Sequence, residues 1–396
     1  MNYDIIIIGA GIVGLASGLK ILEKNPGLKL LILDKENDIA QHQTGHNSGV
    51  IHSGIYYKPG SLKAQNCLNG YKMLIDFCNE HHIKYDLCGK VIVATNDKEL
   101  PLLNSIFERG LANQLEGIKK ISADEVRTIE PHVRSIAGVW VPQTGIINYK
   151  EVSIKYASRI KDMGGEIITG EEVLSIKNSS TIIVKANHGT FECKKLINCS
   201  GLQSDKVTKM TMPDAKLQII PFRGEYYKIR PEKYGLVKNL VYPVPNPEFP
   251  FLGVHFTRMI EGGIEAGPNA VFAFKREGYK KTDFSLNDTF ETIAFPGFRK
   301  IALKYWKTGM GEIYRSISKA AFTKALQHLI PEIQENDLIP GGSGVRAQAC
   351  DADGNLLDDF MILEAGNVIN VCNAPSPAAT SSLSIGNTIA EMALKH

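Results

Sequence analysis

A glycine-rich turn near the N-terminus limits the folds open to this chain more than any other feature. Residues 4–8 form a short apolar run, and Gly9, Gly11 and Gly14 follow in the pattern GxGxxG at the start of an apolar helical pattern. A second apolar run ends at Asp34. Strand, glycines, helix, strand and acid in this order predict the β-α-β unit that binds a dinucleotide. The pattern does not separate NAD from FAD.

Each part of this unit has a physical task. Gly9 permits a tight turn, Gly11 lets the backbone approach a pyrophosphate at the helix N-terminus, and Gly14 lets helix and strand pack closely. Asp34 would accept hydrogen bonds from a ribose. We therefore predict that these residues hold the ADP half of a dinucleotide.

Alternating helix and strand patterns recur in the middle of the chain. A helix is expected around residues 150–161, followed by strands at 166–168, 173–176, 181–186 and 195–199. Such alternation is typical of a sheet with crossover helices.

The segments between these units have a different composition. Residues 81–147 and 211–336 are richer in aromatic residues, prolines and charges. We therefore predict the α/β class, in which a Rossmann-like nucleotide-binding domain is interleaved with an α+β substrate domain that contains a mixed sheet. The predicted nucleotide-binding domain comprises residues 1–80, 148–210 and 337–396, and the predicted substrate domain comprises residues 81–147 and 211–336.

The overall composition excludes several classes of protein. Hydrophobic residues at 43% and charged residues at 22% rule out a disordered, collagen-like or polytopic membrane protein. The 45 basic and 42 acidic side chains leave a net charge of +3, which gives no reason to expect a nucleic-acid partner. The seven cysteines are odd in number and never spaced as CxxC. We therefore expect no metal site, no disulfide framework, and a reducing, cytoplasmic compartment.

The apolar N-terminus differs from a signal peptide. Residues 5–19 are mostly apolar, but Asp4 stands where a signal peptide carries basic residues, and glycines interrupt the run. The run is also too short to span a bilayer. We therefore expect it to belong to the folded protein.

A second motif follows the predicted strand that ends at Asp34. Residues 42–57 read HQTGHNSGVIHSGIYY and place three histidines and three glycines together with no amphipathic period. A solvated surface loop would not need three glycines beside two tyrosines. We therefore predict a shaped loop that offers backbone donors to a polar ligand.

Two further segments are rich in small residues. Residues 341–348 read GGSGVRAQ and are expected to form a loop. Residues 365–390 carry no charge, and the pattern that ends them predicts a helix N-terminus near residues 377–380. Free backbone N–H groups there could hold the negative pyrimidine edge of a reduced flavin. An ordinary capped terminal helix is the alternative.

With these motifs together, the chain closely resembles the L-2-hydroxyglutarate oxidases (dehydrogenases), which are flavoproteins of the D-amino-acid oxidase and glycerol-3-phosphate dehydrogenase superfamily. The resemblance runs nearly from end to end. It is most specific at residues 42–57, and GVRAQ at 344–348 and NAPSPAATSSLSIG at 373–386 reinforce it. It implies a D-amino-acid oxidase-like fold, bound FAD, and oxidation of the C2 hydroxyl of L-2-hydroxyglutarate to 2-oxoglutarate.

The resemblance also implies which residues contact the cofactor. Val173 would lie beside the adenine through its backbone, and Thr44 and Ser48 would line the pyrophosphate, ribityl and flavin region. Gly201 resembles the family's turn near the cofactor. The full predicted set is Gly9, Gly11, Gly14, Asp34, Lys35, Thr44, His46, Ser48, Gly49, Val173, Ser200, Gly201, Pro377, Ala378, Ala379 and Thr380.

Arg346 is the predicted carboxylate-binding residue. It matches an arginine that grips the substrate carboxylate in amine-oxidising relatives, although Ala347 stands where that pattern has proline. The residue chemistry agrees, because a planar guanidinium can pair with a carboxylate of a dicarboxylate in a bidentate way.

Hydride transfer to flavin also requires a base for the hydroxyl proton, and histidine suits neutral pH. His52 is the first candidate because it lies in the 42–57 motif. His255 is the second, on a strand predicted over residues 251–258, where a purely structural role is equally open. Tyr56 and Tyr242 are weaker candidates for hydroxyl contacts.

The electron acceptor is the least constrained partner. Residues 295–307 mix aromatic and basic side chains, so this segment could dock on an anionic membrane to reach quinone or another acceptor. The favoured alternative is a helix of the substrate domain with a solvated basic face. Three other functions stay open: a relative acting on an amine, amino acid or glycerol-3-phosphate, a flavoprotein that uses FAD only structurally, and an NAD-only dehydrogenase.

Overall fold

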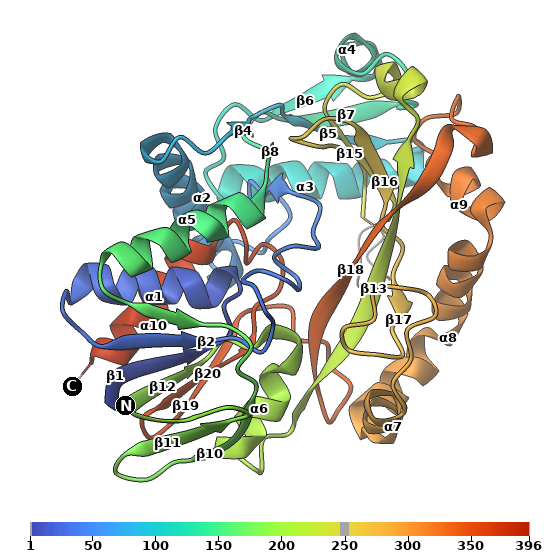
Figure 1. The fold of residues 1–396 in the computed structure, drawn as a ribbon. Helices are drawn as coiled ribbons and strands as arrows, with labels where there is room; N and C mark the ends of the chain where they lie inside the picture. The colour runs from blue at the N-terminus through green and yellow to red at the C-terminus, as the bar shows by residue number, and fades with distance from the viewer. Residues whose placement is uncertain (1, 246–252, 396) are drawn as a thin grey trace.

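The computed structural model describes residues 2–245 and 253–395, and two large β-sheets carry the fold of this part of the chain (Figure 1). The first sheet has eight strands in the order β10-β11-β12-β1-β2-β9, with β20 beside β12 and β19 beside β20. Its strands are β1 (Asn2–Ile8), β2 (Leu30–Leu33), β9 (Glu166–Ile168), β10 (Val173–Lys177), β11 (Ile182–Ala186), β12 (Thr190–Asn198), β19 (Met361–Ala365) and β20 (Val368–Asn373).

The centre of the first sheet is parallel, as the β-α-β pattern predicts. Strand β1 is parallel to both neighbours, with Ile5 opposite Leu30 on β2 and Lys195 on β12. Apolar side chains on both faces are buried, so helices must cover both. Three helices lie together on one face, α1 (Ile12–Lys24), α5 (Tyr149–Asp162) and α10 (Ser382–Leu394), while α2 (Leu62–Glu80) packs on α10 and α6 (Ser204–Thr211) contacts the other face.

The second sheet has nine strands and is mixed, which confirms the predicted mixed sheet. Its order is β17-β13-β16-β15-β14-β5-β7-β6, with β18 on the other edge of β13, and β14 is parallel to β5 while the remaining pairs are antiparallel. Its strands are β5 (Lys90–Ala94), β6 (Lys119–Ser122), β7 (Ala137–Val141), β13 (Leu217–Ile229), β14 (Leu240–Pro243), β15 (His255–Arg258), β16 (Ile264–Gly267), β17 (Val271–Phe272) and β18 (Leu338–Asp351).

The remaining elements surround the second sheet. Helices α8 and α9 lie on its outer side, away from the first sheet (Figure 1). A small sheet in the order β3-β8-β4 lies nearby. The helices are α3 (Leu100–Ala112), α4 (Ala123–Ile129), α7 (Leu286–Ala294), α8 (Pro296–Ile317) and α9 (Lys319–Leu326), and the short strands are β3 (Val50–Ile51), β4 (Tyr85–Asp86) and β8 (Gly145–Ile147). Short 3-10 helices cover Asp97–Glu99, Gly201–Gln203, Pro231–Leu236 and Glu335–Asp337.

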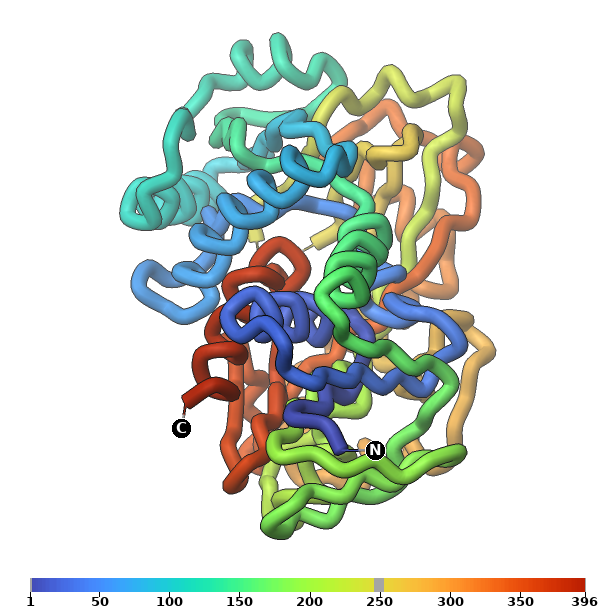
Figure 2. Tube along the Cα trace, turned by 60° about the vertical axis from the view of Figure 1, so that its left-hand side comes forward, coloured from blue at the N-terminus to red at the C-terminus, as the bar shows by residue number. Residues whose placement is uncertain are grey.

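The first sheet draws its strands from segments far apart in the sequence. The N-terminal, middle and C-terminal parts of the chain come together around it, as the tube in Figure 2 shows. They belong to the three segments predicted for the nucleotide-binding domain. Strand β18 lies within the predicted segment 337–396 but pairs with β13 of the second sheet, so the chain returns to the first sheet only at β19. The division into domains stays a prediction.

Two expectations for local structure were wrong. Residues 341–348 form the middle of β18 and not a loop, because β18 pairs with β13 from Leu338 to Asp351 and that ladder satisfies their backbone groups. The C-terminal helix begins at Ser382 and not at 377–380, because residues before it form turns in which the N–H of Ala378 bonds the carbonyl of Pro375. The predicted strand over 251–258 is observed from His255, and residues 251 and 252 lie outside the described part.

A buried ion pair ties the second sheet's connecting segments to α6. The guanidinium of Arg276 donates to both oxygens of Asp205 at 2.5 and 2.8 Å, and each side chain is only 1% exposed. Arg276 also donates to the carbonyl of Leu202, and Asp205 accepts from the N–H of Ile219 on β13. These contacts fix α6 against the second sheet.

Two composition-based expectations concern cysteines and membranes. All seven cysteines are free thiols, in agreement with the expectation that they form no disulfide framework. Within residues 2–245 and 253–395, no helix has the length and apolar character that crossing a bilayer requires.

Candidate functional site

The glycine turn and the end of β12 meet at the carboxyl edge of the first sheet. Gly9 has a φ of +105°, and a side chain there would lie 2.5 Å from the carbonyl oxygen of Cys199. A side chain at Gly14 would clash with the carbonyl of Gly9. Ser200 and Gly201 follow β12 directly and so lie beside the turn. This edge is where open α/β sheets bind their ligands.

Asp34 and Thr44 are bonded to the same turn. Asp34 accepts hydrogen bonds from the N–H groups of Ala10 (2.6 Å) and Glu36 (2.9 Å). Burial nevertheless raises the pKa of Asp34, so hydrogen bonds from a ribose would stabilise its charge. The hydroxyl of Thr44 accepts from the N–H of Ile12 at 3.0 Å. Both predicted residues therefore lie at the N-terminus of α1.

The loop of residues 42–57 and the segment before α10 also come together. The N–H of His52 donates to the hydroxyl of Thr380 at 3.1 Å, and Tyr149 on α5 hydrogen-bonds the same hydroxyl at 2.7 Å. The imidazole Nε2 of His52 lies 3.4 Å from the hydroxyl of Ser376. The first base candidate is therefore held against the segment predicted to contact the flavin.

Several buried hydroxyl oxygens near the contact between His52 and Thr380 have no hydrogen-bond partner among the described residues. Ser53 follows His52 and Ser381 follows Thr380, and both hydroxyls are buried with no hydrogen-bond partner among the described residues. The same holds for the hydroxyl of Tyr56. Buried polar atoms are normally bonded, so an unmatched group of them indicates a ligand. The residues present therefore fit a polar cofactor along this edge.

One face of the second sheet supplies the other candidates. Strand register places Tyr242 on β14 next to His255 on β15. Leu240 lies two residues before Tyr242 on the same face of β14, and it pairs with Lys90 on β5. The rings of Tyr242 and His255 are stacked with centroids 4.0 Å apart. The ammonium of Lys90 lies 4.9 Å from the Tyr242 ring and 4.6 Å from the Tyr56 ring. The loop of residues 42–57 therefore meets this face.

Both histidines are neutral at physiological pH. Burial lowers the pKa of His52 to about 3, and the charges of Lys90 and His255 act in the same direction. Burial also lowers the pKa of His255 to about 3, with contributions from Arg346 and Lys90. His255 Nδ1 lies 2.9 Å from the carbonyl of Gly253, so Nδ1 carries the proton and Nε2 is left as an acceptor.

Arg346 brings a further cation from β18 to the surroundings of His255. It lies opposite Phe222 of β13, and its charge acts on His255 and on Tyr226. Burial lowers the pKa of its guanidinium, and Tyr226 opposes that effect. The charges of Lys90 and Arg346 therefore both act on His255, and the charge of Lys90 also acts on His52. We take these four residues as the lining of the candidate substrate pocket.

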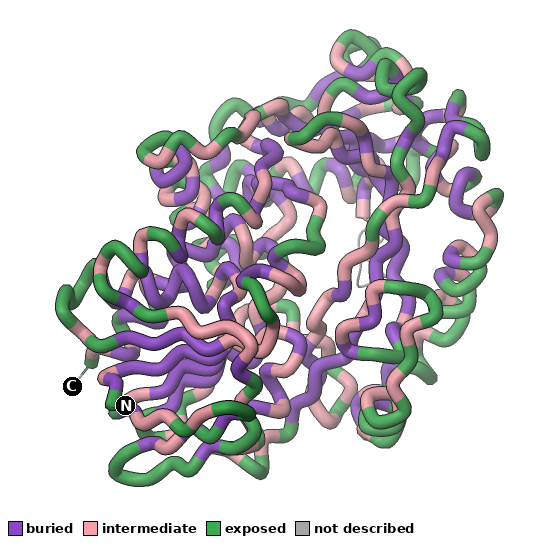
Figure 3. The backbone as a smooth tube through the Cα atoms, viewed as in Figure 1, coloured by how far each residue is buried: buried purple, intermediate pink, exposed green. Residues whose placement is uncertain are grey.

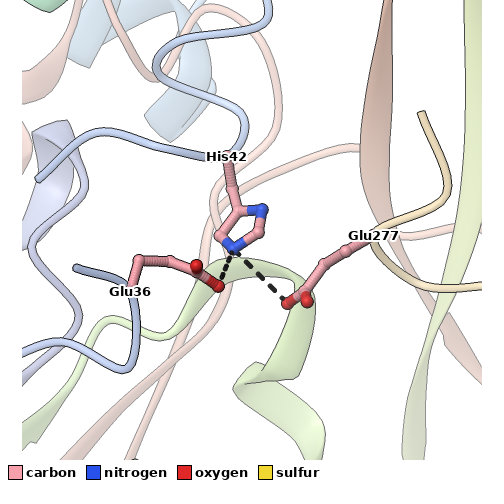
Figure 4. A group of neighbouring side chains, drawn as sticks. All are labelled: Glu36, His42 and Glu277. Carbon is pink, nitrogen blue, oxygen red and sulfur yellow. Dashed lines mark hydrogen bonds and ion pairs between the residues drawn. The ribbon is translucent and has the colours of Figure 1, made fainter. Parts of the chain in front are cut away.

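Two of the predicted cofactor residues, Lys35 and His46, contact other side chains, and their role at the cofactor stays a prediction. His46 stacks on Tyr279 with ring centroids 4.0 Å apart. Lys35 bonds the carboxylates of Glu36 and Glu277 at 2.6 and 2.8 Å, and His42 Nε2 lies 2.9 Å from Glu36 (Figure 4). Glu36, His42 and Glu277 have the donors of a metal site, but the Lys35 ammonium already pairs with both carboxylates. This group joins the segment after β2 to the segment before α7.

The other predicted cofactor residues lie in loops and turns or at the start of a strand. Gly49 adopts a φ of +64° next to β8, Ser48 precedes it, and Val173 begins β10. Pro377, Ala378 and Ala379 form the turns that lead to α10. Their roles stay predictions.

Sequence analysis missed Lys90, the most deeply buried cation of the pocket at 1% exposure. It begins the strand KVIVA, where a lysine looks like an exposed strand end. Only the register of β5, β14 and β15 shows that it faces His255 and Tyr242. No signal in the sequence alone distinguishes it.

Known proteins resemble this chain over its whole length. Residues 4–392 match the family described as FAD dependent oxidoreductase. The L-2-hydroxyglutarate dehydrogenase of Indibacter alkaliphilus is 59% identical and covers 100% of both chains. The L-2-hydroxyglutarate dehydrogenase of Escherichia coli is 44% identical and covers 97% of this chain and 91% of its own.

A solved structure confirms the predicted fold class. Dithionite-reduced L-α-glycerophosphate oxidase from Mycoplasma pneumoniae, with FAD bound, superposes with a TM-score of 0.82. The match covers 100% of this chain and 96% of that one at 23% sequence identity. The interleaved, D-amino-acid oxidase-like architecture is therefore shared.

Proposed function

We infer the reaction from the family, since the chain belongs to the FAD dependent oxidoreductases and, among them, to the L-2-hydroxyglutarate dehydrogenases. It is an oxidoreductase whose cofactor is FAD, so the NAD-only alternative is set aside. We propose that it oxidises the C2 hydroxyl of L-2-hydroxyglutarate and releases 2-oxoglutarate.

The arrangement of charges in the pocket carries this proposal. Arg346 and Lys90 bring positive charge to a buried space that also holds two neutral histidines. A dianionic substrate would neutralise those cations, and a neutral imidazole can accept a hydroxyl proton. An amine-oxidising relative would need to bind a substrate that carries positive charge beside the same cations. The pocket therefore favours a hydroxy acid.

FAD, Arg346 and a histidine would each have a separate role in the proposed reaction. FAD supplies the acceptor for the hydride that leaves C2. Arg346 would pair with a substrate carboxylate and orient C2. His52 or His255 would take the hydroxyl proton at a free imidazole nitrogen as the carbonyl forms. Burial excludes water and strengthens the pairing with Arg346.

Anaerobic titration with the two enantiomers tests the proposal. L-2-hydroxyglutarate should bleach the visible absorption of the bound flavin, and D-2-hydroxyglutarate should leave it unchanged at the same concentration. Glycine, L-proline and glycerol 3-phosphate serve as the comparison panel. Bleaching by a member of that panel and not by L-2-hydroxyglutarate would assign the enzyme to another substrate.

We further propose that α7 and α8 dock on an anionic membrane, where a quinone would be the electron acceptor. Residues 296–307 of this segment are helical, as the favoured alternative expected, and α8 also exposes a row of apolar side chains. Much of the tube at α8 has the colour of exposed residues in Figure 3. Lys300, Lys304 and Lys307 recur at helical spacing beside the stripe. The exposed apolar side chains are Leu286, Phe290 and Ile293 on α7 and Leu303, Trp306, Met310, Ile313, Tyr314 and Ile317 on α8.

This combination suits a helix that lies in the headgroup region of a bilayer. Leu303 and Ile317 are 77% and 78% exposed, so no element among the described residues covers these side chains of α8. Anionic lipids would neutralise the lysines, and acyl chains would cover the stripe. Scattered exposed apolar residues are ordinary, but a stripe along two consecutive helices indicates a binding surface.

Vesicle flotation measures this docking. The FAD-loaded enzyme should float with vesicles that contain phosphatidylglycerol and stay behind with pure phosphatidylcholine. Trp306→Ser combined with Met310→Ser should abolish flotation without changing flavin reduction by substrate. Leu111→Ser, at a residue that is 48% exposed on α3, is the matched control and should float normally. Equal flotation of both variants would contradict docking through α8.

A further inference from the structure

We infer that Lys90 binds the second carboxylate of the substrate, the one farther from the reacting carbon. The inference rests on the proposed function, because it assumes a substrate with two carboxylates. A chain that binds such a substrate in a buried pocket needs a cation for each end. Arg346 accounts for one of them.

The buried position of Lys90 suits a cation that binds a ligand. Its side chain is 1% exposed and projects from β5 onto the sheet face that carries Tyr242 and His255. Within residues 2–245 and 253–395, no carboxylate lies within ion-pair distance of its ammonium, in contrast to Lys63, which bonds Asp358 at 2.8 Å. Long charged residues are almost never fully buried without a partner.

The surroundings of Lys90 hold the ammonium without neutralising it. The faces of the Tyr56 and Tyr242 rings lie 4.6 and 4.9 Å from it, so both rings attract the cation and fix its position. Burial lowers the pKa of Lys90 to about 7, and no carboxylate among the described residues lies close enough to oppose that effect by an ion pair. A bound carboxylate would supply the missing negative charge and restore the protonated form.

Lys90 and Arg346 each lie near a candidate base. The charges of both cations act on His255, and the charge of Lys90 acts on His52. A substrate that spans the two cations would therefore pass close to both base candidates. This arrangement selects a dicarboxylate over a 2-hydroxy acid with an apolar tail, because such a tail would leave Lys90 buried and uncompensated.

The test compares two 2-oxo acids of equal length on the FAD-loaded enzyme. 2-Oxoglutarate has a carboxylate at C5, and 2-oxopentanoate has a methyl group there. Their dissociation constants are read from the perturbed flavin spectrum and from competitive inhibition. Lys90→Met should weaken 2-oxoglutarate roughly 10- to 150-fold, the range for one lost hydrogen bond between charged groups, and leave 2-oxopentanoate within about threefold.

Two further variants separate binding from folding and from simple loss of a lysine. Lys90→Met should bind FAD and unfold at a temperature no lower than the unmodified enzyme, because it removes an uncompensated buried charge. Lys90→Arg keeps the charge and should retain part of the preference for 2-oxoglutarate. Lys120→Met removes a lysine that also lies over an aromatic ring, Phe107 at 4.8 Å, on the same sheet, and should change neither constant.

Three results would overturn the inference. Equal weakening of both 2-oxo acids would show that Lys90 shapes the pocket in general, and unchanged constants would remove it from the site. A slower flavin reduction at saturating substrate, with both constants unchanged, would make it part of the proton transfer. Failure of the proposed function would give a different result, because L-2-hydroxyglutarate would then not bleach the flavin of the wild-type enzyme. The comparison of the two 2-oxo acids can still be made in that case.

Discussion

Replacing the catalytic base, which is either His52 or His255, by alanine should slow flavin reduction by at least ~100-fold while FAD remains bound, because this is the usual scale for a lost general base. Both histidines lie in the pocket in the neutral form, so either can accept the hydroxyl proton without first losing one. Stopped-flow reduction by L-2-hydroxyglutarate at saturating concentration measures the step directly. Wild-type rates in both variants would refute a histidine base.

The two histidines can be told apart by their surroundings. The carbonyl of Gly253 fixes the Nδ1 proton of His255. His255→Gln removes the imidazole ring and should therefore also disturb the stack on Tyr242. His52 is held through its backbone by Thr380, so its side chain can be exchanged without moving the loop. The true base should show the larger loss in the rate of reduction, and the other histidine should show mainly a weaker substrate affinity.

A pH profile adds an independent check on the base. A histidine with a pKa of about 3 is in its basic form throughout the neutral range and loses that form only as the pH falls toward 3. The second-order rate constant of flavin reduction at low substrate concentration, which reports the free enzyme, should therefore show no loss from histidine protonation between pH 8 and pH 5. His328→Ala, at an exposed histidine that bonds Thr95, is the matched control and should leave both rate and profile unchanged.

Arg276→Met should lower the free energy of unfolding by about 3–5 kcal/mol, because it leaves Asp205 buried without its ion-pair partner. Both side chains are 1% exposed, so water cannot replace the lost contacts. For a chain of this length the loss corresponds to a decrease in Tm of roughly 4–6 °C. Thermal unfolding of the FAD-loaded protein, followed by circular dichroism, measures it.

Two comparisons make the stability result specific. Arg127→Met removes an exposed partner of Asp124 and should cost no more than about 0.5 kcal/mol. Arg276→Met combined with Asp205→Leu should recover part of the lost stability, because no buried charge is then left alone. If Arg127→Met and Arg276→Met shift Tm equally, the buried pair has no special role.

The sequence was sufficient to predict the structure wherever neighbouring residues alone determine the local conformation. The turn at Gly9 and Gly14 is such a case, since the close contacts with Cys199 and between the two glycines require residues without side chains. The strand from 166 to 168 was predicted at its observed bounds because alternating apolar runs and Gly-Gly turns mark it.

The sequence was insufficient where pairing between distant strands decides the outcome. Residues 341–348 look like a loop by composition, yet β13 provides a partner for each of them and holds them in β18. Lys90 gains its significance only because β14 and β15 bring Tyr242 and His255 beside it. His46 stacks on the ring of Tyr279, more than two hundred residues later in the sequence, and the sequence did not indicate this contact. No local pattern contains such contacts.

The strand order of the first sheet also makes cofactor binding depend on long-range strand pairing. Strand β20 pairs with β12, and the segment before α10 follows β20, so the carboxyl edge is complete only when strands far apart in the sequence have met. Until α10 packs on α1, part of the apolar surface of α1 is uncovered. Because long-range parallel pairing is slow, a folding intermediate that lacks this edge should bind FAD poorly and should be prone to aggregation.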